Sequence, residues 1–264
     1  ERIVKWGGII RWTIGDCCEA SEQAFQAALA KLQFEEAVNT MRTGQVDDSK
    51  VSHRLLHFTV SEDSGFLGGS YMFASSYVCD LVLDRGARDS LWKVGELVSA
   101  MEAEPVAVLR GQLFEWVAHR VLTATKVLEN ARDLEDGSLW NYTLGSRLLV
   151  RFDSLAEVNE EQYGVPRSRR FPTLDSVAPP KLAFQMTTDI NHGVGVNGLV
   201  EAVKALPGLQ ALVFVVPDNM APGFPMQKYL AQHGKVYSKS LPPSVRKVKL
   251  LVYGVSLSFN LDSQ

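Results

Sequence analysis

The sequence predicts an α/β protein with a helical N-terminal part, residues 1–104, and a mixed sheet flanked by helices, residues 105–264. Two observations predict this division. Up to Glu104 the helix signals dominate, and after it short alternating or continuous apolar runs become common. The elements expected in the second part follow the order α-β-β-β-α-β-α-β, which is typical of a mixed sheet covered by helices.

The first part carries three segments with helical spacing of apolar residues. The first is an amphipathic stripe that Ser21 caps. Another segment, Leu55 to Val60, alternates loosely, so it indicates either a short strand or the start of a helix. The expected helices cover residues 21–32, 71–83 and 90–102, and the expected loops cover 43–50 and 61–70.

The second part is expected to begin with a helix and to continue mainly as strands. In the helix, residues 106–128, apolar positions form a stripe along one side. The continuous apolar run Leu212 to Val216 indicates a buried strand. The other expected elements are strands at 140–152, 181–187 and 248–257, helices at 198–206 and 225–232, and a polar loop at 153–170.

Residues 181–187 alternate strictly in chemistry, and a turn acid, Asp175, stands just before them. Side chains alternate along a strand, so Lys181, Gln185 and Thr187 share one face. An acid at one strand end, facing polar groups two residues apart on the next strand, is the skeleton of a restriction-endonuclease-type metal site. The hard oxygen ligands of such a site suit Mg²⁺.

In a site of this type an Asp is followed by Glu-x-Lys, and the bound ion activates water for phosphodiester cleavage. Here Gln185 occupies the Glu position and Thr187 the Lys position. An amide oxygen is a weaker ligand than a carboxylate, and Thr brings no positive charge. Lys181 lies two pleats away, roughly 13 Å along the strand. The alternative stays open that Asp175 is an ordinary turn residue and Gln185 an ordinary strand residue.

Glu115 is the third candidate metal ligand, and it lies on the helix that begins the second part. It shares a small, polar face with Gly111 and His119 because of their i, i+4 spacing. A small residue one turn before the acid would let the helix approach the sheet. The alternative is a solvated surface acid. The loop after the expected strand adds Asp189 and His192 as further candidates.

Composition restricts the partners. The net charge of −3 gives no general attraction to nucleic acid, so DNA binding would need a local basic patch. No apolar run approaches the roughly 18 residues of a membrane span. Cys17, Cys18 and Cys79 do not form a disulfide framework, which indicates reduced thiols in a cytosolic or nuclear setting. The basic residues that could track a phosphate backbone are Arg167, Arg169, Arg170, Lys235, Lys239, Arg246, Lys247 and Lys249.

Four stretches, in their order along the chain, carry a further signal. They are residues 4–12, with Gly7-Gly8 and Arg11; residues 52–58 with 71–78; residues 111–115; and the set 172–176, 184–187 and 212–217. Together these stretches resemble the C-terminal part of the Crinkler effectors, the host-translocated cell-death proteins of oomycetes such as Phytophthora.

The resemblance implies that residues 1–104 correspond to the helical region after the core of a P-loop NTPase module, and residues 105–264 to a restriction-endonuclease-like domain. It also implies that the secretion segment and the Walker A strand are not in this sequence. The family's proposed site corresponds to Glu115, Asp175 and Gln185, with Mg²⁺ as the implied cofactor. The sequence Gln-x-Thr departs from the family's Glu-x-Lys.

By the same resemblance the protein is secreted by a pathogen and acts in the host nucleus or cytoplasm, where it alters cell death or immunity. Two functions stay open. One is an effector with a nuclease-like domain that cleaves or binds DNA with Mg²⁺. The other is a non-catalytic effector that keeps the nuclease fold and binds host proteins as a homodimer; Thr187 and the acidic net charge favour it.

A homodimer is also expected from the helical part. Without the nucleotide-binding core, its apolar helix faces would meet water, at roughly 1.5–3 kcal/mol per large side chain. Burial between two copies would most simply have two-fold symmetry. The large side chains expected to take part, unless they form the core, are Trp6, Trp12, Phe66, Tyr71, Met72 and Trp92.

Overall fold

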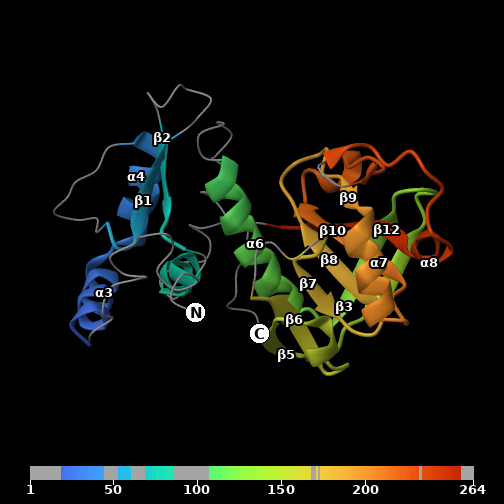
Figure 1. Ribbon diagram of the computed structural model, residues 1–264, viewed down its shortest axis with the longest axis horizontal. Coiled ribbons are helices and arrows are strands. Elements are labelled where there is room, and N and C mark those ends of the chain that lie inside the picture. Colours follow the sequence, from blue (N-terminus) through green and yellow to red (C-terminus); the bar gives the residue numbers. More distant parts are fainter. Residues whose placement is uncertain are drawn as a thin grey trace. The chain divides into compact units, whose positions relative to one another are not determined.

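The computed structural model describes residues 19–44, 53–60, 69–75, 77–85, 107–167, 171, 173–231 and 234–256 (Figure 1). The chain forms two compact units. The first includes the chain up to Trp116, and the second spans Val117–Leu257. The division expected at residue 105 falls outside the described residues and stays a prediction.

The described part of the first unit contains helices and a two-stranded antiparallel sheet. Strands β1 and β2 pair antiparallel, with Leu56 opposite Phe73. The guanidinium of Arg85 donates to the carbonyl oxygens of Leu29 and Ala30, both at 2.8 Å, near the C-terminal end of α3. It thereby satisfies carbonyls that the helix leaves free. The elements are α3 (Glu19–Lys31), α4 (Phe34–Thr43), β1 (Leu56–Val60), β2 (Gly69–Phe73) and a helical segment at 77–85.

The structure corrects one expectation for this unit, adds a helix that was not expected, and leaves other expectations untested. The helix expected at 71–83 is wrong at its start, because residues 71–73 belong to β2 and the helix covers 77–85. Helix α4 was not predicted at all. Tyr71 and Met72 are half-buried. The helix expected at 90–102 and the residues Trp6, Trp12, Phe66 and Trp92 lie outside the described residues.

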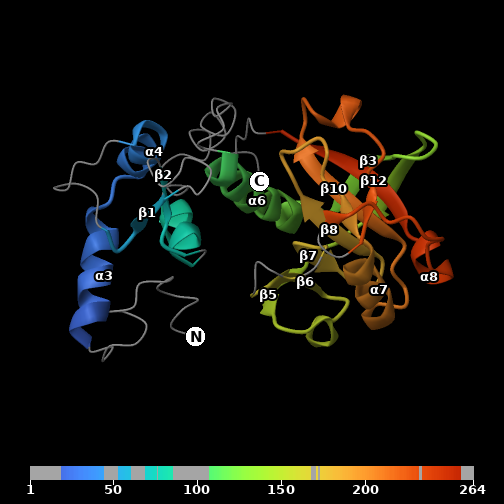
Figure 2. The same ribbon diagram turned by 45° about the horizontal axis from the view of Figure 1, so that its top comes forward.

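The second unit is built on a large, curled mixed sheet of eight strands in the order β4-β3-β12-β10-β8-β7-β6-β5 (Figures 1 and 2). Its centre is parallel: β10 runs parallel to both β8 and β12. The strands are β3 (Val127–Asp133), β4 (Leu139–Thr143), β5 (Leu148–Phe152), β6 (Gln162–Pro166), β7 (Ser176–Ala178), β8 (Leu182–Met186), β10 (Ala211–Pro217) and β12 (Lys249–Val255). A separate pair joins β9 (Val194–Gly195) and β11 (Tyr229–Leu230).

Helix α7 (Val196–Ala205) covers one face of this sheet. Its Leu199 shares a buried apolar cluster with Ala183 of β8 and Phe214 of β10. The C-terminal half of α6 (Ala107–Ala124) lies on the other face. There the ring of His119 is 5.8 Å from that of Tyr163, which is 6.0 Å from that of Phe184. Neighbouring residues of β8 therefore point to different helices. Short helical turns lie at Leu155–Glu157 (η2), Ala221–Gly223 (η3) and Pro243–Arg246 (α8).

The strands expected at 140–152, 181–187, 212–216 and 248–257, and the helix expected at 198–206, are confirmed. The helix expected at 106–128 ends at Ala124, and Leu128 already lies in β3. The loop expected at 153–170 is wrong in part, because it contains β6. The helix expected at 225–232 is wrong: the chain there is extended and contributes β11, which pairs with β9. The α/β class and the mixed sheet flanked by helices are confirmed.

Candidate functional site

Asp175 lies half-buried at a bulge just before β7. Its N–H donates to the carbonyl of Phe184 at 2.9 Å, although Phe184 is also the register partner of Ser176. Asp175 and Ser176 thus both lie opposite Phe184, and two residues opposite one form a β-bulge. The Asp175 Oδ2 accepts the N–H of Met186 at 2.7 Å. The carboxylate therefore takes the place of the backbone carbonyl that a longer β7 would offer to β8.

Gln185 points to the α7 face of the sheet, because it pairs in parallel register with Phe214. Its side chain is only 8% exposed. The amide nitrogen lies 2.8 Å from Nε2 of His192. An amide nitrogen only donates, so the imidazole accepts and carries its own proton on Nδ1. The amide oxygen Oε1 is buried without a hydrogen bond in the described part of the chain.

His192 is suited to this acceptor role by its surroundings. Burial lowers the pKa of the imidazole below its ordinary value, and the nearby charge of Asp189 opposes this effect only in part. A lowered pKa keeps the ring neutral near pH 7. Gln185 and His192 therefore form a neutral, half-buried pair between the end of β8 and the loop that leads to β9.

Thr187 fixes the first turn of the same loop. Its side chain is 6% exposed, and its Oγ1 accepts the N–H of Asp189 at 2.9 Å. The carboxylate Oδ1 of Asp189 in turn accepts the N–H of Asn191 at 2.9 Å. These are local turns of the kind that Thr and Asp favour. The position expected to hold a catalytic lysine thus has a structural contact with the loop.

Lys181 lies outside this cluster. It is exposed and precedes the first residue of β8, whereas Gln185 lies near the last. Its backbone carbonyl accepts the N–H of Gln210 at 2.8 Å, which ties the start of β8 to the start of β10. The structure therefore gives Lys181 a place at the opposite end of the strand from Thr187.

Glu115 lies on α6 in the part of the helix that belongs to the first unit. Its approach to Asp175 stays a prediction. One turn further along, His119 Nδ1 lies 2.9 Å from the hydroxyl of Tyr163, which lies 2.7 Å from the hydroxyl of Ser176. This chain of hydrogen bonds is on the α6 face. Gln185 points to the α7 face, so Gln185 and the part of α6 that belongs to the second unit lie on opposite sides of the sheet.

Tyr163 and Ser176 were not expected from the sequence, and both are fully buried. The signal that could have found Tyr163 is the apolar alternation in Gln162–Pro166, which was interpreted as loop. A buried hydroxyl needs a partner, because its desolvation is otherwise costly. The bonds from His119 to Ser176 meet that need, so we interpret them as structural.

The donor set fits Mg²⁺ poorly. Of the three expected ligands, Glu115, Asp175 and Gln185, Asp175 uses Oδ2 to accept a backbone N–H. The Oε1 of Gln185 is the one buried, unused acceptor found among the described residues of this cluster. A neutral amide oxygen alone gives little of the negative charge that Mg²⁺ sites use. Among the described residues, no group of three or more His, Cys, Asp or Glu is placed to hold a metal ion.

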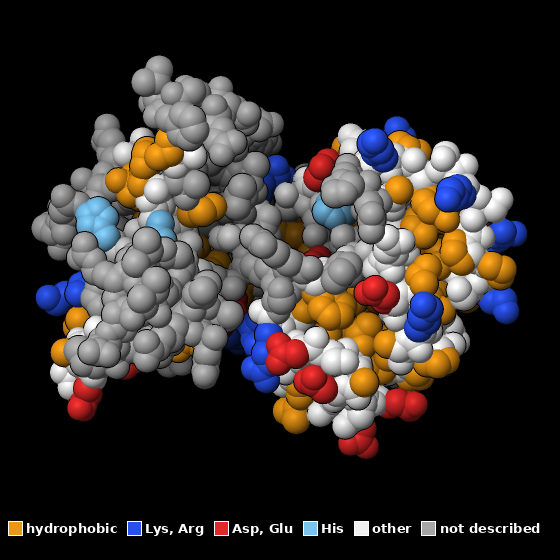
Figure 3. All heavy atoms as spheres, viewed as in Figure 1, with side chains coloured by type: hydrophobic (Ala, Val, Ile, Leu, Met, Phe, Trp, Pro, Cys, Tyr) orange, Lys and Arg blue, Asp and Glu red, His pale blue; other side chains and the backbone are white. Residues whose placement is uncertain are grey.

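Three of the described basic residues have partners within the chain, whereas Lys235, Lys239 and Lys247 are exposed. Arg167 pairs with Asp153 at 3.2 Å, and Lys249 pairs with Asp133. The guanidinium of Arg246 donates to the carbonyl of Leu241. The face of the second unit seen in Figure 3 carries basic and acidic side chains together. Arg169 and Arg170 lie outside the described residues.

Comparison with known proteins gave no relative: no family model, no curated protein and no solved structure matches the chain. The resemblance to Crinkler effectors therefore stays an expectation. Within the described ranges, no helix is both long and apolar enough to cross a membrane.

Proposed function

We propose that this protein is a non-catalytic effector that keeps a nuclease-like fold and acts by binding host proteins. The proposal rests on the contacts of Gln185 and Thr187, the two positions where the expected nuclease site has Glu and Lys. Gln185 holds His192, and Thr187 holds the turn at Asp189. In an active nuclease of the expected type, a carboxylate and a lysine at these positions would serve the metal and the attacking water.

The topology supports a restriction-endonuclease-like fold for the second unit. Helix α6 is followed by six strands, β3 to β8, of which β6, β7 and β8 form an antiparallel meander. After the short β9 come α7 and β10, which runs parallel to β8. The expected order has three strands between the two helices, so the correspondence lies in this meander, α7 and β10. The proposal extends to residues 1–104 as a remnant of an NTPase module, and to action in the host nucleus or cytoplasm after secretion by the pathogen.

The proposal is tested by expressing the full chain in host leaf tissue and scoring cell death. Asp175→Asn removes the carboxylate charge but keeps an oxygen that can accept the Met186 N–H. We expect it to keep the activity of the wild type at equal protein level. Loss of cell death in Asp175→Asn, with the protein still folded and abundant, would overturn the binding role in favour of catalysis.

A second candidate function is Mg²⁺-dependent cleavage or binding of DNA, and one observation favours it. The buried Oε1 of Gln185 has no hydrogen bond in the described part of the chain, although such acceptors are normally satisfied. A cation or a water molecule at this oxygen would satisfy it. For this candidate, Mg²⁺ must raise the melting temperature of the wild type but not that of Asp175→Asn; equal shifts for both proteins would rule out a site that uses Asp175.

A further inference from the structure

The outer edge of β4 is open for pairing with another strand. Asp133 donates its N–H to the carbonyl of Ser138, and Leu144 donates to that of Lys126. In an antiparallel pair the bonding direction alternates along the strand. The even-numbered residues of β4 therefore bond to β3, and the N–H and C=O groups of Leu139, Asn141 and Thr143 point outward. We call these outward groups the β4 edge.

Nothing in the described structure bonds to the β4 edge, which ends the eight-stranded sheet. The side chains of Leu139, Asn141 and Thr143 are exposed, and that of Leu139 is 63% exposed. Proteins usually protect such edges with proline or with charged residues, especially lysine. The β4 sequence, Leu-Trp-Asn-Tyr-Thr, contains none of these, and its Trp, Tyr and Thr favour strands.

The bulge in β3 leaves the β4 edge accessible. The register shifts by one residue between Leu128 and Ala131, so the extra residue is on β3 and not on β4. Asn130 adopts a left-handed conformation there, with φ 58°, and donates its N–H to Oδ1 of Asn141 at 2.7 Å. The Asn141 side chain is thus turned toward β3, away from the edge.

We propose that the β4 edge binds the β4 edge of a second copy of this chain, antiparallel about a two-fold axis at Asn141. The three outward residues are symmetric about Asn141. Leu139 then pairs with Thr143 of the other copy, and Asn141 pairs with its own equivalent. Every outward N–H and C=O of both strands is satisfied in this register. An isologous contact of this kind closes as a dimer and does not propagate.

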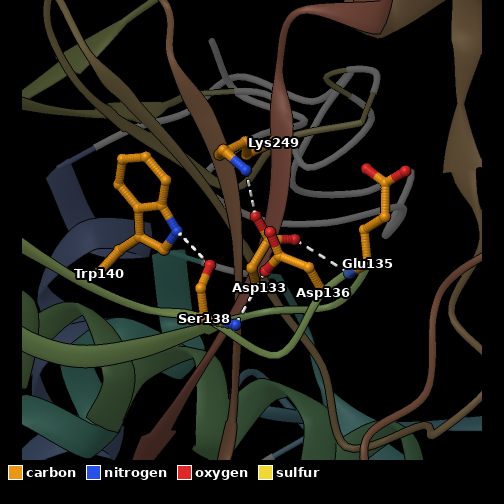
Figure 4. A network of polar contacts seen from close by, with 6 residues as sticks. All are labelled: Asp133, Glu135, Asp136, Ser138, Trp140 and Lys249. Carbon is orange, nitrogen blue, oxygen red and sulfur yellow. Dashed lines mark hydrogen bonds and ion pairs between the residues drawn. The ribbon is translucent and has the colours of Figure 1, made fainter.

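The aromatic residues of β4 support this register. Trp140 and Tyr142 stack on the same face, with ring centroids 6.2 Å apart and planes at 16°. Trp140 is held by a hydrogen bond from Nε1 to Oγ of Ser138 and by Lys249, whose Nζ lies 4.8 Å from the ring centroid (Figure 4). Pairing about Asn141 places Trp140 of one copy opposite Tyr142 of the other. Cross-strand aromatic pairs are among the contacts that stabilise sheets.

Charge at the two ends of β4 favours a second copy over an unrelated peptide. The turn before β4 carries the exposed acids Glu135 and Asp136, seen beside Asp133 in Figure 4. Lys126, also exposed, pairs through its carbonyl with Leu144, just after β4. Antiparallel pairing brings the acidic turn of each copy toward the Lys126 end of the other. Opposite charges at an interface set the orientation of the partners.

The test uses two matched variants of the full chain, measured by sedimentation over a concentration series. In the Leu139→Lys/Thr143→Lys variant each new lysine faces a lysine of the other copy. In the Leu139→Glu/Thr143→Lys variant each glutamate faces a lysine. We expect the first to raise the dimer Kd about tenfold or more, and the second to keep it near the wild-type value.

Both variants change exposed side chains only, so their melting curves as monomers should match that of the wild type. A wild-type chain that stays monomeric throughout the concentration series would overturn the proposal. A dimer equally stable in all three proteins would also overturn it, because the chain would then associate through another surface, such as the helical part. Neither outcome bears on Asp175, so this test is independent of the proposed function.

Discussion

The contact between Asp175 and Met186 predicts how two substitutions at one position should differ. Asp175→Ala removes the oxygen that accepts the N–H of Met186 at 2.7 Å. Met186 is 8% exposed, so water cannot easily replace that acceptor. Losing a charged partner and leaving a buried donor unsatisfied costs about 2 kcal/mol. For a unit of the size of Val117–Leu257, this lowers the melting temperature by about 6 °C.

Asp175→Asn should behave differently, because its side-chain oxygen can accept the same bond. We expect it to stay within about 1 kcal/mol of the wild type, since only the extra strength of the charged bond is lost. The assay is thermal and urea unfolding of all three proteins at pH 7, followed by circular dichroism. An Asp175→Ala protein as stable as the wild type, or an Asp175→Asn protein as unstable as Asp175→Ala, would refute this account of the carboxylate.

Three further predictions concern other contacts of the second unit. Arg147 donates to four backbone carbonyls, so Arg147→Met should lower the free energy of unfolding in urea by about 3 kcal/mol. Arg147→Lys should keep less than half of the stability that Arg147→Met loses. A loss near zero in Arg147→Met would contradict this prediction. Lys249→Met leaves the carboxylate of Asp133, only 2% exposed, without its ammonium partner and should lower the free energy of unfolding by about 2 kcal/mol. Adding Asp133→Asn to Lys249→Met should recover most of this loss, and additive losses would argue against the pair. Burial lowers the pKa of His192 in the folded state, so the unfolded chain binds protons more readily and the stability should fall as the pH drops below 6.5. His192→Gln should flatten this pH dependence only in part, because the pKa of His57 is lowered as well. An unchanged pH dependence in His192→Gln would exclude His192 as its source.

The central strands were predictable because their apolar residues indicate that they are buried. β10 is a continuous apolar run with both faces covered, and β8 shows strict alternation with large apolar residues. The missed elements depend on partners. Strand β2 was interpreted as helix because Tyr71 and Met72 also fit helical spacing, and its pairing with β1 decides the matter. β11, only two residues long, exists because it pairs with β9.

The contacts of the candidate site residues could not be predicted from the sequence. Asp175 accepts the N–H of Met186, Gln185 bonds His192 and Thr187 accepts the N–H of Asp189. Spacing alone could not show the bulge that turns the Asp175 carboxylate to a backbone N–H. Nor could it place His192 over Gln185, because that contact depends on the fold of the loop between β8 and β9. The contacts of these side chains thus depend on backbone features that residue spacing does not encode.

The most direct test of the claim that this site holds a loop, and not a catalytic metal, is a nicking assay on supercoiled DNA with Mg²⁺. The wild type and Asp175→Asn are compared at equal concentration, after their melting temperatures are shown to agree. We predict no cleavage by the wild type above that of Asp175→Asn. Mg²⁺-dependent cleavage by the wild type that disappears in the folded Asp175→Asn protein would contradict the claim.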